Sequence, residues 1–284
     1  MARRERVTVT VREDLLRSLD RLVDNDKIRN RSHALEYLLS RALGGGPTQA
    51  VILASGEGVK MRPFSYEIPK CLIPVQGKPI LEHTIERLRE HGFRDIIITV
   101  SHLAKKIEDH FGDGSKFGVT ITYVREKKLR GTGWSLKEAS KHIKTDTFVL
   151  WYGDVLMDLD VTELVHMHQS LHAAVATLVL SPVFDPSPYG AVKLRGTKIV
   201  DFEEKPKISP SVSHLVFSGC AVVNRALFDY VPARHKKSGV SLENDIFPEL
   251  ISQGVLHGYP IEGQWFDVST PEIYEQVLKQ WQSQ

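Results

Sequence analysis

Apolar and polar positions follow two different periods in the first 43 residues. From Arg6 to Arg12, valines alternate with arginines and threonines, which predicts a β-strand with one polar face. Apolar residues then recur at helical spacing from Leu15 to Val23, and again from about Ser32, a good N-cap, to Ala42. A strand and two helices of this size cannot bury their own apolar faces. We therefore expect this segment to need a partner chain.

From Thr48 onward, predicted strands and amphipathic helices alternate. The expected strands are 51–54, 95–101, 119–124 and 147–152, and the expected helices are 78–91, 103–111 and 134–142. Such alternation predicts an α/β fold, with a mostly parallel, Rossmann-like mixed sheet covered by helices on both faces. Ligands of such sheets bind at the carboxyl ends of the strands.

Composition separates the two parts. Residues 1–43 hold ten Lys and Arg against seven Asp and Glu, although the whole chain has a net charge of only +2. Three glycines and a proline, Gly44–Pro47, follow directly and are typical of a flexible linker. We predict a module over 1–43, a linker over 44–48 and an α/β domain over 49–284.

The remaining composition indicates a cytoplasmic protein that does not enter a membrane. The chain is 42% hydrophobic and 25% charged, which is ordinary for a globular protein. No apolar run is long enough to span a membrane, and the start of the sequence lacks the apolar core of a signal peptide. Two cysteines, Cys71 and Cys220, have no metal-ligand spacing and are expected to be buried thiols.

The segment 51–74 is the most informative part of the chain. An apolar run ends at Ala54 and is followed by Ser55–Gly58, in which two glycines allow a tight turn and close approach to a ligand. Lys60, Arg62 and Lys70 follow. Backbone N–H groups and cations of this kind suit a phosphate chain, but an ordinary turn with a solvated basic loop has the same features.

This segment resembles the nucleotide-binding loop of the sugar-phosphate nucleotidyltransferases, or NDP-sugar pyrophosphorylases, whose pattern is roughly LAGGxGTRLxPxT…PK. The matching residues are Leu53, Ala54, Gly56, Gly58, Met61, Pro63, Pro69 and Lys70. Val59 and Lys60 stand where the family has Thr-Arg. The resemblance implies that Lys60 and Lys70 stabilise the pyrophosphate. It also implies nucleotide binding by Leu53, Ala54, Ser55, Gly56 and Gly58.

A second segment, 125–133, follows a predicted strand and opens a predicted helix. In the resembling family this region holds the nucleotide base, which implies contacts from Glu126 and the backbone near Gly131. A carboxylate at Glu126 suits a base edge with N–H donors, guanine best and uracil or thymine next. The alternative is an exposed Glu in a charged turn.

Two aspartates lie in separate family motifs. Asp154 follows Gly153 at the end of a predicted strand, as in the family's GD motif, and Asp267 lies in a segment similar to W-x-D-x-G-T-P. The resemblance implies that both carboxylates bind Mg²⁺ together with phosphate oxygens and water. A lone Asp at a strand end is otherwise a helix cap or turn residue.

The remaining motifs resemble the sugar-phosphate half of the family. YG, EKP and E-x-D-x-FP patterns occur in the family's order, and Gly219 lies where a glycine supports the sugar ring. The implied sugar-phosphate site consists of Tyr189, Gly190, Glu204, Lys205, Gly219, Glu243 and Trp265. Lys205 would contact the sugar phosphate, and the alternative is a surface Glu-Lys pair of little energetic value.

The first module resembles the ribbon-helix-helix DNA-binding family over residues 5–43. In that family two chains pair their strands, and outward strand residues enter the major groove of double-stranded DNA. The resemblance implies base contacts from Arg6, Thr8 and Thr10, with a phosphate held near Ser32. The alternative is a module that only dimerises the enzyme.

Together the motifs imply a Mg²⁺-dependent enzyme that joins an NTP to a sugar-1-phosphate and releases pyrophosphate. We expect a homodimer or higher oligomer. The alternative is a DNA-binding regulator whose weakened catalytic domain senses nucleotide or sugar phosphate, because Lys60 lacks the bidentate fork of the family's Arg. Since the chain ends soon after the W-x-D-like motif, we expect no β-helical acyltransferase domain of the kind that some members carry.

Overall fold

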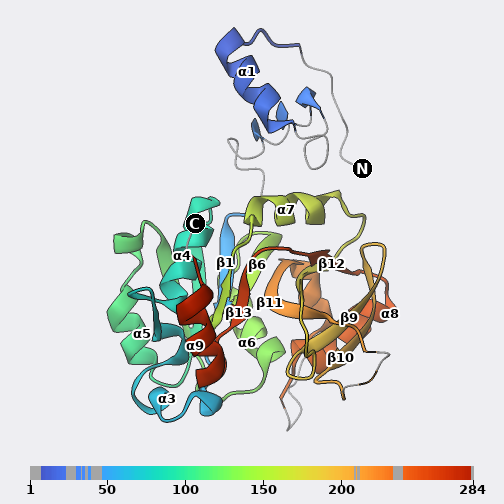
Figure 1. Ribbon diagram of the computed structural model, residues 1–284. Helices are drawn as coiled ribbons and strands as arrows, with labels where there is room; N and C mark the ends of the chain where they lie inside the picture. The colour runs from blue at the N-terminus through green and yellow to red at the C-terminus, as the bar shows by residue number, and fades with distance from the viewer. Residues whose placement is uncertain are drawn as a thin grey trace. The chain divides into compact units, whose positions relative to one another are not determined.

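The chain forms two units in a computed structural model, 1–46 and 47–284 (Figure 1). The structure describes residues 8–23, 30–32, 34–35, 38–39, 47–207, 209, 212–232 and 239–282. The boundary falls after Gly46, inside the expected linker.

The first unit contains two helical segments joined by an ion pair. Helix α1 (Glu13–Leu22) overlaps the predicted helical segment but begins two residues before it, and residues 31–32, 34–35 and 38–39 belong to a second helix. The Arg31 guanidinium donates to both carboxylate oxygens of Asp20, at 2.6 and 2.7 Å. Because Arg31 is already helical, Ser32 lies in the first turn of this helix, and the prediction of Ser32 as its N-cap is wrong.

The described part of the strand expected near the N-terminus, residues 8–12, does not form a strand in a single chain. Residues 8–12 belong to no helix or strand, and Arg6 lies outside the described residues. A β-strand is stable only when a neighbouring strand satisfies its N–H and C=O groups. In a ribbon-helix-helix arrangement that neighbour would come from a second chain, and Thr8 and Thr10 are exposed here.

The second unit is built on a mixed sheet whose first half is parallel. Strands β5 (Thr120–Arg125), β4 (Asp95–Val100), β1 (Gln49–Leu53) and β6 (Thr147–Tyr152) lie side by side in this order, all parallel. Strands β4, β1 and β6 are apolar and buried along most of their length because both faces are covered, whereas the edge strand β5 is exposed at both ends. The predicted strands of this half are confirmed to within one residue for β4, β5 and β6.

The second half of the sheet runs largely antiparallel. Strand β11 (Leu215–Asn224) is antiparallel to both β6 and β8 (Ala176–Pro182). Beyond β8 lie β12 (Leu256–Pro260), β10 (Lys198–Glu204) and β9 (Gly190–Arg195). Only the β8–β12 pair is parallel among these described strands. The expected mostly parallel sheet is therefore wrong for this half, since the two-residue β9–β10 connection permits only a hairpin.

Helices cover both faces of the sheet (Figure 1). One core contains residues of α4 (Ile80–Glu90), α5 (Ala104–Phe111) and α7 (Val161–Ser170), and the other contains residues of α6 (Thr132–Ala139) and α8 (Phe247–Ser252). Strand β1 shows the division directly. Ala50 and Ile52 join the first core and Val51 joins the second, as the alternation of side chains along a strand requires.

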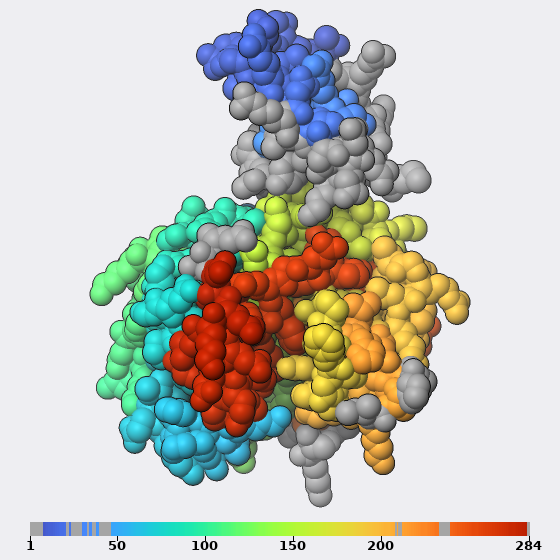
Figure 2. Space-filling view, in the orientation of Figure 1, coloured from blue at the N-terminus to red at the C-terminus, as the bar shows by residue number. Residues whose placement is uncertain are grey.

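Two small ribbons and two further helices also belong to this unit. They are β2 (Pro74–Val75) with β3 (Lys78–Pro79), β7 (Val155–Met157) with β13 (Trp265–Asp267), α3 (Phe64–Glu67) and α9 (Pro271–Gln280). Short 3₁₀ turns occupy Val59–Met61, Lys70–Leu72, Ser115–Phe117, Ser140–His142 and Arg225–Tyr230, and a π-helical turn occupies Leu242–Ile246. In Figure 2 the red C-terminal segment crosses the visible face of the unit. None of the described helices has the length and apolar character needed to span a membrane.

A buried histidine makes the stability of this unit depend on pH. His168 is 5% exposed, and its Nδ1 lies 2.8 Å from Thr177 Oγ1. Burial, aided by the neighbouring His257, lowers the pKa of His168 to about 4. Histidine in the unfolded chain binds a proton below about pH 6.5, so the unfolded state binds more protons between pH 6.5 and 4. Stability contributed by the neutral His168 is complete above pH 6.5 and is lost as the pH falls through this window.

We expect the free energy of unfolding to fall by about 2 kcal/mol between pH 7 and pH 5 through His168 alone. His168→Asn keeps a polar group near Nδ1 but does not titrate. Urea unfolding at both pH values should therefore show a smaller pH dependence in the variant, by about that amount. Equal pH dependence in the two proteins would contradict this prediction.

Candidate active site

The loop after β1 folds tightly over Lys70. Gly58 has φ 63°, in the left-handed region, and its carbonyl accepts a hydrogen bond of 2.7 Å from Ser65 Oγ. A Cβ added to Gly58 would lie 3.1 Å from Ser65 Cβ and 3.4 Å from Lys70 Cβ. Both the backbone conformation and the close approach therefore favour glycine at this position. Gly56, by contrast, faces open space.

The turn after β6 lies directly against this loop. Gly153 N donates to Leu53 O at 2.9 Å, and a Cβ on Gly153 would lie 2.9 Å from Ala54 Cβ. Because β1 and β6 are adjacent and parallel, their carboxyl ends meet at one edge of the sheet. Asp154, the next residue, is thereby placed beside the glycine loop.

A lysine and two aspartates meet at this edge. Lys70 Nζ forms an ion pair with Asp154 Oδ2, and both side chains are largely buried. The β7–β13 ribbon brings in Asp267, which pairs with Val155 in register, and Val268 N donates to Asp154 O at 3.0 Å. Two carboxylates that are 113 positions apart in the sequence thus lie next to one lysine.

The charges in this cluster affect one another. Burial raises the pKa of Asp267 to about 6, and the negative charge of Asp154 adds to the shift, while Lys70, the Ser269 hydroxyl and Lys60 oppose it. Burial alone would lower the pKa of Lys70, but the carboxylates of Asp154 and Asp267 raise it. The structure therefore brings together Lys60, Lys70, Asp154 and Asp267, the residues expected to act on the phosphates.

The carboxylate pair fits a hard divalent cation. Burial and the neighbouring negative charge of Asp154 raise the pKa of Asp267, so added positive charge would stabilise this pair, and oxygen ligands are those that Mg²⁺ prefers. Among the described residues no group of three or more His, Cys, Asp or Glu could hold a metal alone. Mg²⁺ commonly binds through one or two carboxylates plus substrate phosphates and water, so Asp154 and Asp267 suffice for such a site.

A second group of polar side chains lies at the ends of β6 and β10. Glu243 accepts hydrogen bonds from Thr132 Oγ1 at 2.7 Å, from Ser241 Oγ at 2.6 Å and from the Tyr152 hydroxyl. Burial raises the pKa of Glu204, and the nearby charge of Glu243 adds to this shift. The predicted sugar residues Glu204 and Glu243 are thus neighbours.

Lys205 extends from this group into solvent. Its Nζ lies 3.3 Å from Glu204 Oε1, and its side chain is 62% exposed. The backbone has φ 49° at Lys205, and its N–H donates to Tyr189 O at 2.8 Å. This link ties the predicted EKP and YG motifs together.

Aromatic rings connect the two groups. The rings of Tyr189 and Trp265 meet edge to face at 5.1 Å, and Trp265 Nε1 donates to Ser218 O at 2.8 Å. Burial raises the pKa of Tyr189 to about 12, and the charge of Asp267 adds to the shift. The predicted sugar-phosphate residues are therefore continuous with the carboxylate pair.

Two of the predicted glycines are required by close packing here. A Cβ on Gly190 would lie 2.2 Å from the Phe202 ring, and one on Gly219 would lie 3.0 Å from Val155 Cγ2. Gly219 also has φ 80°. Both glycines therefore fix the packing of the strands beneath the predicted sugar site.

The predicted base-binding residue is buried. Glu126 is 8% exposed and its carboxylate accepts from Ser55 and, at 2.8 Å, from Ser135. The alternative interpretation of Glu126, as an exposed residue in a charged turn, is therefore wrong. Gly131 has φ 88°, and a Cβ there would lie 2.4 Å from Val240 O. The backbone conformation and the packing against Val240 therefore explain why this residue is a glycine.

Sequence reasoning missed the hydroxyl groups that hold these carboxylates. Thr132 and Tyr152 bind Glu243, and Ser135 binds Glu126. Thr132 lies inside the predicted segment 125–133, Ser135 lies two residues after it, and Tyr152 directly precedes Gly153, which is the sequence signal that marks them. Ser55 is a further departure from the family pattern, which has glycine at that position.

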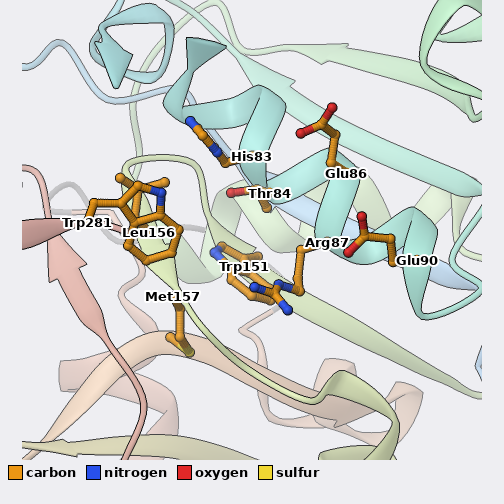
Figure 3. Close-up of a pocket in the computed structure, with 9 residues that line it drawn as sticks. All are labelled: His83, Thr84, Glu86, Arg87, Glu90, Trp151, Leu156, Met157 and Trp281. Atoms are coloured by element: carbon orange, nitrogen blue, oxygen red, sulfur yellow. The ribbon is translucent and has the colours of Figure 1, made fainter. Parts of the chain in front are cut away.

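A small cavity lies apart from these residues (Figure 3). Its volume is about 50 Å³, and its walls are His83, Thr84, Glu86, Arg87, Glu90, Trp151, Leu156, Met157 and Trp281. The buried Trp281 Nε1 has no hydrogen-bond partner among the described residues. The cavity includes none of the lysines or carboxylates described above.

Several known proteins are similar to this chain in sequence or in fold. A uridylyltransferase for UTP and glucose-1-phosphate from Synechocystis sp. is 35% identical over 81% of this chain, and a mannose-1-phosphate guanylyltransferase from Mycobacterium tuberculosis is 34% identical over 79%. The chain spans 62% of the length of each. A solved structure from Bacillus anthracis shares 25% identity with a TM-score of 0.75, over 81% of this chain and 94% of that one. A UDP-glucose pyrophosphorylase complex, 19% identical, has the same fold, with a TM-score of 0.71 over 82% of this chain and 97% of that one.

The matched region coincides with the second unit. The family described as Nucleotidyl transferase matches residues 49–284, which include the glycine loop, both aspartates and the sugar-side motifs. With its sheet, its glycine loop and its carboxylate pair in place, this chain belongs to the nucleotidyl transferase family.

Proposed function

We propose that the protein joins an NTP to a sugar-1-phosphate, giving an NDP-sugar and pyrophosphate. One observation carries this proposal: Lys70, Asp154 and Asp267 come together beneath the glycine loop although they lie in three separate motifs. The two curated relatives are named as enzymes that act on sugar-1-phosphates, which supports the proposal.

The reaction requires positioning and charge neutralisation and no protein nucleophile. An oxygen of the sugar-1-phosphate attacks the α-phosphorus of the NTP, the bond to the bridging oxygen breaks, and pyrophosphate leaves with that oxygen. Lys205 orients the attacking phosphate, and Lys60 and Lys70 stabilise the leaving pyrophosphate. Asp154 and Asp267 would hold Mg²⁺, which would supply Lewis-acid neutralisation of the phosphate charge.

The base and the sugar have to be measured. The name of one relative gives UTP and glucose-1-phosphate as its substrates. The name of the other gives mannose-1-phosphate and the transfer of a guanylyl group, so the two names differ in both the base and the sugar. Pyrophosphate release across a panel of NTPs and sugar-1-phosphates tests the proposal. Turnover with one pair supports it. Absence of turnover with every pair, alongside measurable nucleotide binding, would favour the alternative of a regulator that senses its ligands.

We propose further that the first unit dimerises the protein and binds double-stranded DNA. Leu15, Leu38 and Leu39 are 50%, 39% and 51% exposed on helices that should bury them, which supports a second copy as partner. The ribbon-helix-helix resemblance and the basic residues of this unit support the DNA contact. Thr8 and Thr10 remain the proposed base contacts, together with Arg6, and Ser32 remains near the proposed phosphate contact.

Leu39→Glu should convert the dimer to a monomer, because a charge would have to be buried in an apolar contact. The full chain should sediment as a dimer, and duplex DNA binding should weaken at least 10-fold in the variant because two half-sites are no longer linked. Leu278→Glu is the matched control, since Leu278 is 50% exposed on α9 of the other unit. A variant at Leu39 that remains dimeric would overturn this interface.

A further inference from the structure

A chain of hydroxyl groups holds the Glu126 carboxylate in place. Ser135 Oγ lies 2.8 Å from Oε2, and Ser55 Oγ contacts Oε1. Ser55 Oγ is also 2.8 Å from Thr99 Oγ1. All four side chains are buried, at 8% exposure or less. They come from the carboxyl ends of β1, β4 and β5 and from α6, which places them at the ligand-binding edge of the sheet.

The direction of these hydrogen bonds follows from the chemistry of the groups. A carboxylate only accepts hydrogen bonds, so Ser55 and Ser135 both donate to Glu126. Since the proton of Ser55 is then used, Thr99 must donate to Ser55. The carboxylate is thus held from both sides, and it cannot rotate without losing a charge-assisted hydrogen bond.

The remaining acceptor positions define what this carboxylate can recognise. Each carboxylate oxygen accepts about two hydrogen bonds, and one on each oxygen of Glu126 is occupied by a serine. One position on each oxygen is left. The complementary ligand therefore presents two adjacent, parallel N–H donors.

Among the common bases only guanine presents such an edge, through its ring N1–H and its exocyclic amino group. Uracil and thymine have one N–H between two carbonyls, which would set a carbonyl oxygen against the carboxylate. Adenine and cytosine place a ring-nitrogen acceptor beside their amino group. Sites built for a specific donor reject analogues that lack it, because a buried polar group is then unpaired.

We infer that the base subsite is a guanine site and that Ser55 and Ser135 are the positioning residues that aim Glu126 at it. This inference rests on the proposed nucleotidyltransferase function, because it assigns the base for that reaction. Ser55 is the more distinctive of the two. The family pattern has glycine there, so the hydroxyl is a feature of this chain rather than of the motif.

The test compares GTP with ITP, which lacks only the exocyclic amino group. We expect the full chain to prefer GTP over ITP by about 10- to 100-fold in kcat/KM, and to prefer GTP over UTP, dTTP, ATP and CTP. Ser55→Gly and Ser135→Ala should each reduce the GTP:ITP ratio to within about 3-fold, chiefly through a higher KM for GTP. Ser55→Gly restores the family residue, so it should preserve the fold.

Ser140→Ala is the matched control. It removes a partly buried serine hydroxyl at the end of the helix that carries Ser135, where Ser140 Oγ donates to Lys137 O at 2.7 Å, so the GTP:ITP ratio should be kept. Preference for another NTP by the unaltered protein would overturn the guanine assignment while leaving the reaction intact. A GTP:ITP ratio unchanged in both serine variants would overturn the positioning role. Absence of turnover with every NTP would instead contradict the proposed function.

Discussion

Asp154→Asn should lower kcat by about 10³-fold, equivalent to about 4 kcal/mol of transition-state stabilisation. The variant keeps the shape of the side chain but removes the negative charge that Lys70 and the expected Mg²⁺ require. Steady-state pyrophosphate release at saturating substrates measures the effect. Mn²⁺ binding in the presence of nucleotide should weaken in parallel, because one of the two carboxylates of the cluster is lost.

Asp158→Asn is a matched control, because Asp158 forms an ion pair that is buried to a similar degree. The Arg87–Asp158 ion pair has a length of 2.9 Å, and its side chains are 18% and 24% exposed, against 16% and 24% for Lys70 and Asp154. Breaking either pair leaves a largely buried cation without its partner, so both variants should be less stable. Only Asp154→Asn should lose turnover, with kcat of Asp158→Asn within about 3-fold of the parent. Equal losses in kcat would show that the effect reports on folding and not on the site.

The proposed catalytic residues were predictable because each lies in a short, contiguous motif. The apolar run before Ser55 and the one before Gly153 are both buried strands, and strands of this kind are recognised from local sequence. Once they are adjacent and parallel, the residues that follow them must meet. The clustering of Asp154 near the glycine loop therefore follows from local patterns plus one rule of sheet geometry.

The second half of the sheet could not be predicted in the same way. The direction of β11 depends on its pairing with β6 and β8, contacts that join residues more than 30 positions apart. Local periodicity identifies a strand but does not specify its neighbours or its direction. The first unit shows a related limit, because residues 8–12 have the pattern of a strand but belong to no strand among the described residues of one chain.

The hydroxyl groups around Glu126 and Glu243 were missed for another reason. Ser and Thr are common on surfaces and in turns, so their sequence positions carry little information. Their role appears only when the fold places a buried carboxylate beside them, as with Ser135 and Glu126. Buried carboxylates need such donors, but the sequence does not show which serine or threonine the fold will bring to them.

The second large effect is expected at Lys205, on the sugar side of the site. Lys205→Met should raise KM for the sugar-1-phosphate by about 30-fold and lower kcat by about 10²-fold, while KM for the NTP stays within about 3-fold. The Lys205 side chain is 62% exposed and makes one ion pair, with Glu204 at 3.3 Å. Its loss should therefore cost little stability, since exposed ion pairs contribute about 1 kcal/mol or less.

Lys207→Met separates a local contact from a general loss of positive charge. Lys207 is exposed in the same segment, two residues further on. The backbone N–H of Lys205 donates to Tyr189 O at 2.8 Å, and this hydrogen bond fixes the position of the Lys205 backbone beside the YG motif. Lys205→Arg keeps the charge and should recover part of the activity. If Lys207→Met raised KM for the sugar-1-phosphate as much as Lys205→Met did, the lysines would act through the overall field of the segment. In that case the proposed contact between Lys205 and the attacking phosphate would be wrong.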